Sequence, residues 1–135
     1  MSEVEEVPVE RGLLDTSVFI AREAGRPLGP MPEAAAISVV TVAELHLGVL
    51  MADGPAARAR RLRTLSLLMA TFDPLPIDSG VARIFAELVA EARRQGRRPG
   101  IMDTWIAATA VAHDLSLYAQ DDDFAGIPWV RVVRI

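Results

Sequence analysis

The chain has 135 residues and 51% of them are hydrophobic, so its length and composition fit one domain with an ordinarily packed core. It contains no cysteine, which excludes disulfides and thiolate metal sites, and no lysine, which excludes P-loop nucleotide binding, protein kinase chemistry and lysine Schiff bases. The formal net charge of −4 gives no support to nucleic-acid binding, because proteins that hold phosphate backbones usually carry an excess of basic residues.

The N-terminal residues and the hydropathy indicate neither export nor membrane insertion. Residues 1–11 include Glu3, Glu5 and Glu6 and no apolar run, which is unlike a secretory signal. No stretch reaches the apolar length that spans a bilayer. We therefore expect a cytoplasmic protein with no membrane partner, a flexible segment over residues 1–11 and a single domain over residues 12–135.

Short apolar segments alternate with segments of helical periodicity along the chain. In chain order we predict a strand at 12–15, a helix at 18–23, a strand at 36–40, a helix from Thr41 to Asp53, a helix at 56–71, a short strand at 75–77, a helix at 79–95, a helix at 101–113, a strand at 116–119 and a strand at 129–135. Strands that alternate with helices form parallel sheets covered on both faces. The predicted fold is therefore α/β, a three-layer α/β/α sandwich with a central, mostly parallel sheet.

Acidic residues follow or precede several of these strands, at one predicted edge of the sheet. Asp15 ends the first strand, Glu44 lies in the first turn of the helix after the second, and Asp103 lies in the first turn of the helix before 116–119. Three aspartates follow that strand: Asp121, Asp122 and Asp123. Because ligands of open parallel α/β sheets bind beyond the carboxyl ends of the strands, we expect these side chains to share one pocket.

Each acidic residue also has a purely structural explanation. Thr41 and Glu44 have the spacing of a capping box, Asp103 could complement a helix dipole, and Asp15 could begin a turn. Taken singly, the structural explanation is favoured for Glu44 and Asp103. Taken together, converging carboxylates are unfavourable unless a cation or protons neutralise them, and an all-oxygen site suits Mg²⁺ or Mn²⁺.

Such a site suits phosphodiester hydrolysis, which needs an activated water molecule and a neutralised oxyanion. A metal ion held by carboxylates provides both, and the sequence is compatible with one ion or with two. Thr16 and Ser17, beside Asp15, could hold a metal-bound water or a phosphate oxygen while also capping the first helix. In an extended loop Asp123 would face the same side as Asp121 and help through a bound water, and Asp122 would face solvent.

Four short motifs resemble those of the PIN domain family. They are Leu14-Asp15-Thr16-Ser17, Val42-Ala43-Glu44-Leu45 with Gly48, Met102-Asp103-Thr104-Trp105-Ile106-Ala107-Ala108-Thr109-Ala110, and Asp121-Asp122-Asp123-Phe124. No single motif is specific, but the four in this order, spacing and total length are. The resemblance covers the chain from Gly12 onward and is closest to VapC-type toxins.

The resemblance implies a PIN-like sandwich, a Mg²⁺- or Mn²⁺-dependent endoribonuclease, a toxin controlled by a small cognate antitoxin protein, and a homodimer. It carries catalytic roles onto Asp15, Glu44, Asp103 and Asp121, of which Asp15, Asp103 and Asp121 would bind metal. Two alternatives stay open. One is a PIN-like nuclease that acts on DNA or structured nucleic acid, and the other is a catalytically silent protein-binding module on the same fold.

The arginines form two clusters that could bind RNA. One comprises Arg58, Arg60, Arg61 and Arg63, and the other comprises Arg93, Arg94, Arg97 and Arg98. Arginine binds phosphate bidentately, but charge runs are equally typical of solvated helix faces, and the sequence leaves both interpretations open. The second cluster directly precedes the helix that carries Asp103, so its four arginines are the candidates for contacts with the RNA backbone.

Overall fold

The computed structural model describes residues 10–135, and most of the segment expected to be flexible lies outside them. Its elements, in chain order, are β1 (Arg11–Leu14), α1 (Thr16–Glu23), β2 (Ala34–Ala36), α2 (Val39–Leu50), α3 (Pro55–Thr71), α4 (Ser79–Arg94), α5 (Ile101–Ala112), β3 (Ser116–Ala119) and β4 (Val132–Arg134). None of the helices in this part of the chain is both long and apolar enough to span a membrane.

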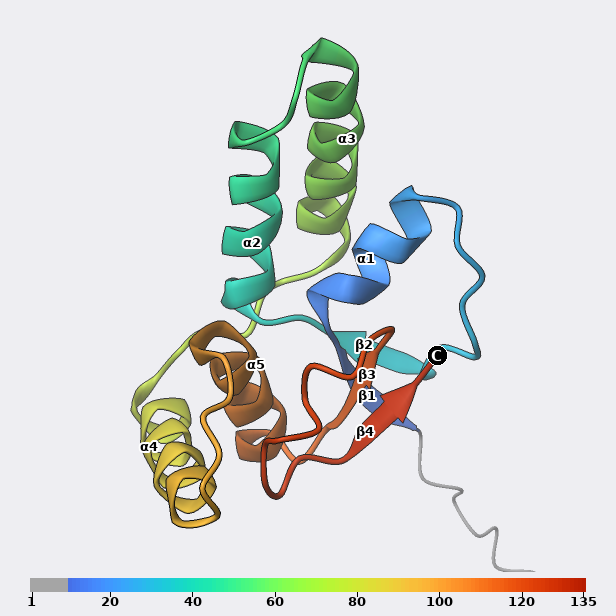
Figure 1. Ribbon diagram of the computed structural model, residues 1–135. Coiled ribbons are helices and arrows are strands. Elements are labelled where there is room, and N and C mark those ends of the chain that lie inside the picture. The colour runs from blue at the N-terminus through green and yellow to red at the C-terminus, as the bar shows by residue number, and fades with distance from the viewer. Residues whose placement is uncertain (1–9) are drawn as a thin grey trace, which may run out of the picture.

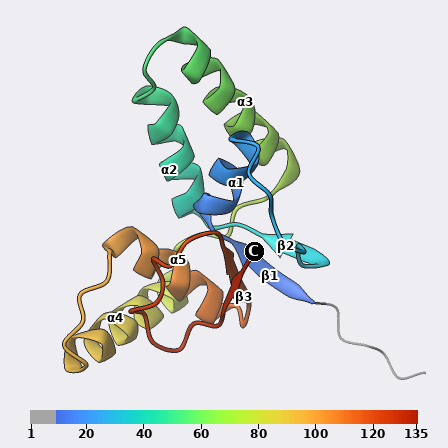
Figure 2. The ribbon, with the colours of Figure 1, turned by 45° about the vertical axis from the view of Figure 1, so that its right-hand side comes forward.

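The four strands form one all-parallel sheet in the order β2-β1-β3-β4. Helices α1, α2 and α3 lie on one side of this sheet, and α4 and α5 lie on the other (Figures 1 and 2). The predicted α/β fold with three layers is therefore confirmed. Helices α2 and α3 form an antiparallel hairpin that extends well beyond the sheet (Figure 1).

Successive residues of the two central strands enter different cores. Leu13 and Leu117 belong to the core shared with α4 and α5, whereas Leu14 and Tyr118 belong to the core shared with α1, α2 and α3. Adjacent strand residues point to opposite faces, so a strand covered on both sides must be apolar at every position. The uninterrupted Leu13-Leu14 and Leu117-Tyr118 pairs meet this requirement.

Gly12 lets β1 and the Tyr118 ring approach closely. A Cβ atom at position 12 would lie 2.4 Å from Cε1 of Tyr118 and 3.0 Å from Cγ of Pro32. The ring is fixed from its other end as well, because the Tyr118 hydroxyl donates a hydrogen bond to the Glu10 carboxylate. Position 12 of β1 therefore has no room for a side chain.

Three predicted strands have different bounds in the structure. The strand predicted at 36–40 is wrong beyond residue 36, because Ser38 caps α2 by accepting a hydrogen bond of 3.0 Å from the Val40 amide. The strand predicted at 75–77 is reduced to one bridge between Ser38 and Leu75, since the flanking Pro74 and Pro76 have no N–H to donate. The strand predicted at 129–135 is confined to β4.

Candidate active site

Asp15 lies at the end of β1 and is the N-cap of α1. Its Oδ2 accepts a hydrogen bond of 3.1 Å from the Ser17 amide, and its own amide donates to the Tyr118 carbonyl at 2.9 Å. The residue is only 4% exposed. The Ser17 hydroxyl accepts a hydrogen bond of 3.0 Å from the Gln120 amide, so it joins the start of α1 to the end of β3. The Ser17 amide thus fixes this carboxylate where the ends of β1 and β3 are joined.

Glu44 is held by a threonine of another helix. The Thr16 hydroxyl donates a hydrogen bond of 2.7 Å to Oε1 of Glu44, and the Thr16 and Thr41 hydroxyls are hydrogen-bonded at 3.0 Å. Because α2 begins at Val39, Thr41 lies inside the helix and Glu44 lies in its second turn. The capping box expected of Thr41 and Glu44 is therefore wrong, and the Glu44 carboxylate faces the start of α1.

The remaining aspartates come from α5 and from the loop after β3. Asp103 lies in the first turn of α5 and is half-buried. Asp121 follows β3 by two residues, and its Oδ1 accepts a hydrogen bond of 3.3 Å from the Asp123 amide. Asp122 forms an exposed ion pair with Arg134 of β4.

The negative charges of neighbouring carboxylates, together with burial, raise the pKa of three aspartates of this site. Burial raises the pKa of Asp103 to about 6, with further contributions from the negative charges of Asp15, Asp123, Glu44 and Asp121. Burial also raises the pKa of Asp15, and the Asp121 charge adds to that rise. The Asp121 charge is the largest cause of the raised pKa of Asp123. All five carboxylates thus belong to one electrostatic centre, which we call the acidic centre.

No side-chain cation neutralises the acidic centre in the part of the chain that the structure describes. The four ion pairs among residues 10–135 join Arg83 to Glu87, Arg94 to Glu91, Arg131 to Asp114 and Arg134 to Asp122. Within the same residues, no three acidic or histidine side chains already converge as closely as metal ligands do. The donor set is nevertheless all oxygen and carries an unbalanced negative charge, which fits a hard divalent cation once the side chains rotate onto it.

Three arginines of the two clusters form contacts within the protein. Arg61 donates a hydrogen bond of 2.7 Å to the Gly48 carbonyl and so joins α3 to α2. Arg94 is paired with Glu91 at 2.9 Å. Arg97 donates to the carbonyl of Ala125, at 3.4 Å, in the loop that carries Asp121.

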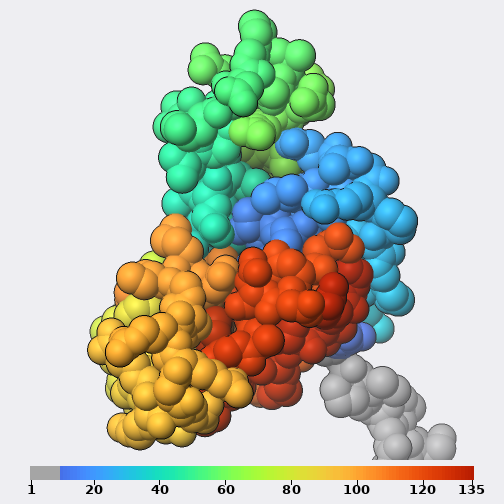
Figure 3. Space-filling model, in the orientation of Figure 1, coloured from blue at the N-terminus to red at the C-terminus, as the bar shows by residue number. Residues whose placement is uncertain are grey.

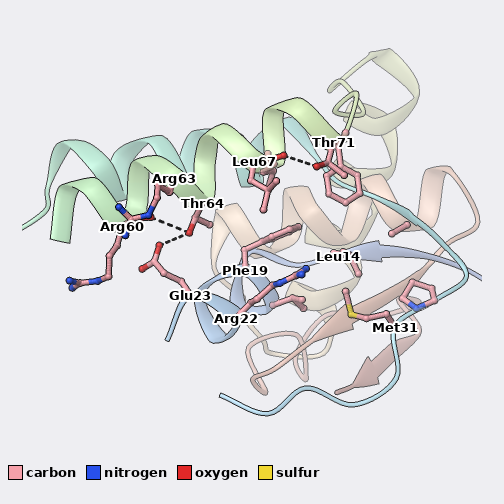
Figure 4. A pocket seen from close by; sticks show the side chains of 15 residues that line it. Leu14, Phe19, Arg22, Glu23, Met31, Arg60, Arg63, Thr64, Leu67 and Thr71 are labelled. Carbon is pink, nitrogen blue, oxygen red and sulfur yellow. Dashed lines mark hydrogen bonds between the residues drawn. The ribbon is translucent and has the colours of Figure 1, made fainter. Parts of the chain in front are cut away.

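An apolar groove of about 660 Å³ between α1 and α3 is a feature that the sequence analysis missed (Figure 4). Phe19, Leu67 and Leu68 form part of its wall, and Arg60 and Arg63 lie at its rim. Leu67 is 62% exposed. The sequence of α3 does contain an indication of this groove. Its apolar residues lie on more than one face of the helix, between the arginines, whereas a helix that packs on one side only has a single apolar face.

The PIN domain family model matches residues 12–130 of the chain. The chain belongs to the PIN domain family. Among curated PIN-domain relatives, Ribonuclease VapC4 of Mycobacterium tuberculosis is 49% identical over 130 residues, which cover 94% of this chain and 98% of the relative. Ribonuclease VapC5 of the same organism is 46% identical over 129 residues, which cover 92% of this chain and 95% of the relative.

A solved PIN-domain structure agrees with the fold over nearly the whole described chain. It is a member of the VapBC family of toxin–antitoxin systems, VapBC-5, from Mycobacterium tuberculosis, with a TM-score of 0.81 and 43% identity. The match covers 93% of this chain and 98% of the other. The predicted family is therefore confirmed. PIN-domain ribonucleases generally use a divalent metal ion, which agrees with the chemistry of the acidic centre.

Proposed function

We propose that the protein is a metal-dependent endoribonuclease that cleaves RNA phosphodiester bonds, and that it is the toxin of a toxin–antitoxin pair. The observation that carries the proposal is the acidic centre, in which burial and the negative charges of carboxylates from four separate segments raise the pKa of Asp15, Asp103 and Asp123. Among residues 10–135, no side-chain cation forms an ion pair with these three aspartates. The names of the relatives, which are VapC ribonucleases, support the choice of RNA.

In this proposal Asp15, Asp103 and Asp121 bind Mg²⁺ or Mn²⁺. Such an ion would activate a water molecule and neutralise charge on the phosphate. Asp15 is the most rigid of the three ligands because the Ser17 amide fixes its Oδ2. The Thr16 hydroxyl occupies Oε1 of Glu44 and leaves Oε2 free to accept a proton from water. Ser17 and Asp123 complete the site as auxiliary groups.

The apolar groove is the surface that we assign to the antitoxin. Large exposed apolar patches mark protein–protein contacts, and the solved relative VapBC-5 belongs to a toxin–antitoxin system. The rim arginines Arg60 and Arg63 favour a partner helix with an apolar face and acidic flanks. From this groove, we expect an arginine or lysine of the partner to reach the acidic centre and pair with a carboxylate. We also expect the protein to form a homodimer.

The central experiment is cleavage by protein that has been separated from any inhibitor. RNA is expected to be cut with Mg²⁺ or Mn²⁺ and to remain intact with EDTA, and Asp103→Asn should abolish the cutting. Cleavage of a matched DNA in preference to RNA would instead identify a DNA nuclease. A folded protein that shows no heat of metal binding by calorimetry and cuts neither substrate would be a silent binding module.

The assignment of the groove has its own test. A copurifying inhibitor should suppress cleavage by wild type but not by Leu67→Asp, which places a charge in the groove. Met69→Asp changes an exposed apolar residue of α3 that does not line the groove, and it should remain inhibited. If Leu67→Asp stays inhibited but changes from dimer to monomer, the groove belongs to a second copy of the chain.

A further inference from the structure

A second cavity, of about 360 Å³, lies between the end of α4 and the beginning of α5. We call it the α4–α5 cavity, and its walls comprise Phe85, Val89, Arg93, Arg97, Arg98, Pro99, Ile101 and Thr104. Phe85, Val89 and Arg93 are four residues apart on α4 and therefore lie along one face of the helix. The cavity is thus lined both by apolar side chains and by three arginines.

The three arginines of this cavity have no acidic partner in the structure. No carboxylate in residues 10–135 forms an ion pair with Arg93, Arg97 or Arg98, and all three side chains are exposed. Arg94 differs, because Glu91 binds its guanidinium and it does not line the cavity. The cluster of four arginines in the sequence is therefore three arginines around a cavity and one that faces elsewhere.

The α4–α5 cavity borders the acidic centre. Thr104 lines it and is adjacent in sequence to Asp103. Arg97 reaches the Ala125 carbonyl in the loop after β3, the loop that carries Asp121 and Asp123. The space-filling view shows the same neighbourhood, with the connection between α4 and α5 beside the segment that follows β3 (Figure 3). A ligand held in the cavity would lie next to the proposed cleavage site.

We propose that the α4–α5 cavity is a nucleotide subsite for the RNA strand, with one base on the floor of Phe85, Val89 and Ile101 and the flanking phosphates on the three arginines. The inference rests on the proposed function. Single-stranded RNA is typically bound by unstacked bases on aromatic or apolar surfaces and by guanidinium groups on phosphates. The volume lies within the range of about 300–1,000 Å³ found for small-molecule sites.

Electrostatics gives an independent reason for this placement. The chain carries a net charge of −4, and its acidic centre repels a polyanion until metal is bound. Unpaired arginines at the border of the centre supply local positive charge where the strand must approach. An acidic segment of a protein partner is the competing occupant. Adjacency to the acidic centre favours RNA.

The test compares binding and cleavage of one single-stranded RNA oligonucleotide. Binding is measured by fluorescence anisotropy in EDTA at several salt concentrations, and cleavage is measured at steady state with Mn²⁺. The triple variant Arg93→Gln, Arg97→Gln, Arg98→Gln should bind about tenfold or more weakly and raise KM, with kcat near wild type. The slope of log affinity against log salt should fall by about 0.7 for each phosphate that the variant no longer binds.

Two kinds of variant test the base and the specificity of the arginines. Ile101→Ala shortens an exposed apolar side chain of the cavity, so it should weaken binding severalfold without changing the salt slope. Arg83→Gln, at an exposed arginine that is paired with Glu87 on the same helix, should bind as wild type. Arg94→Gln should weaken binding much less than the triple variant does. Because all these positions are exposed, unchanged melting temperatures are expected throughout.

The outcomes separate the subsite from the proposed function. If wild type cuts RNA and the triple variant binds and cuts equally well, the subsite is wrong and the ribonuclease stands. If Arg83→Gln or Arg94→Gln weakens binding as much as the triple variant, the effect is general surface charge and the subsite is again wrong. A triple variant that keeps its RNA affinity but binds an inhibitor protein more weakly assigns the cavity to that protein. If folded wild type neither binds nor cuts RNA, both proposals fall.

Discussion

Thr16 and Glu44 are joined by a hydrogen bond of 2.7 Å across the junction of α1 and α2, although they lie 28 residues apart in the sequence. The bond makes Thr16 a positioning residue for the Glu44 carboxylate. Thr16→Val keeps the shape and removes the donor, so we expect kcat to fall about tenfold, as misplaced catalytic groups do. The free energy of unfolding should fall by about 1–2 kcal/mol.

The control for this prediction is Thr16→Ser, which restores the hydroxyl. It should recover most of the kcat that Thr16→Val loses, measured with saturating RNA and metal. A Thr16→Ser variant as slow as Thr16→Val would show that the methyl group matters and that the hydrogen bond does not.

The acidic centre should make the stability of the metal-free protein depend on pH. The pKa of Asp103 rises from 3.8 in the unfolded chain to about 6 in the folded protein, so the folded state binds this proton more tightly. Its contribution to stability is therefore complete below about pH 4 and is lost as the pH rises to about 6. After a reduction for solvent screening at this half-buried site, we expect a loss of about 1–2 kcal/mol.

Denaturant unfolding in EDTA between pH 4 and pH 7 measures this loss. Asp103→Asn should be more stable than wild type at pH 7, and its free energy of unfolding should depend less on pH. The raised pKa of Asp15 should preserve part of the pH dependence. Asp73→Asn, which changes an aspartate outside the acidic centre, should follow wild type. A steep profile that survives in Asp103→Asn would contradict the assignment.

Metal should stabilise the folded protein, because an ion relieves the repulsion in the acidic centre. At a concentration one hundred times its Kd, Mg²⁺ or Mn²⁺ is expected to add about 2.7 kcal/mol, seen as a higher melting temperature. Asp15→Asn removes a ligand in this proposal and should lose most of the shift. An equal shift in wild type and Asp15→Asn would place the ion elsewhere.

The sequence predicted where Asp15 and Asp121 lie, because buried strands place the residues that follow them at a known edge of the sheet, and it predicted Asp103 in the first turn of the helix before β3. It did not predict that Thr41 lies inside α2 and that its hydroxyl is hydrogen-bonded to the Thr16 hydroxyl. Ser38 and Thr41 are both good N-caps, and only the packing of the helix against the sheet decides between them. The apolar groove and the α4–α5 cavity depend on how helices pack side by side, which periodicity within one helix does not determine.

The three consecutive aspartates should differ in their importance for cleavage. Asp121→Asn is expected to lower Mg²⁺-dependent turnover by more than about 100-fold, and Asp123→Asn by about tenfold, as the loss of an outer-shell group does. Asp122 is paired with exposed Arg134, and its charge is the smallest of the causes that raise the pKa of Asp123, so Asp122→Asn should turn over RNA near the wild-type rate. Equal losses in folded Asp121→Asn and Asp122→Asn would overturn this order.

Gly12→Ala should destabilise the protein through a clash in β1. The new methyl group would lie 2.4 Å from Cε1 of Tyr118, a ring that is 1% exposed and cannot move away. Overpacking of this kind typically lowers the free energy of unfolding by about 1–3 kcal/mol. Gly48→Ala is the matched control, because its methyl group meets only Cδ of Arg61 at 3.8 Å, and a helical alanine should add about 0.5–1 kcal/mol.

The order of the strands has a consequence for the synthesis of the protein. Asp15 follows β1, but the acidic centre forms only when β3, the third strand along the chain, has been inserted beside β1 and the loop with Asp121 has followed it. Domains form as units while a chain is made from its N-terminus. A nascent chain that has not been synthesised as far as residue 123 therefore has an incomplete acidic centre. The ribosome that makes this nuclease does not meet an assembled active site until translation of the domain is nearly finished.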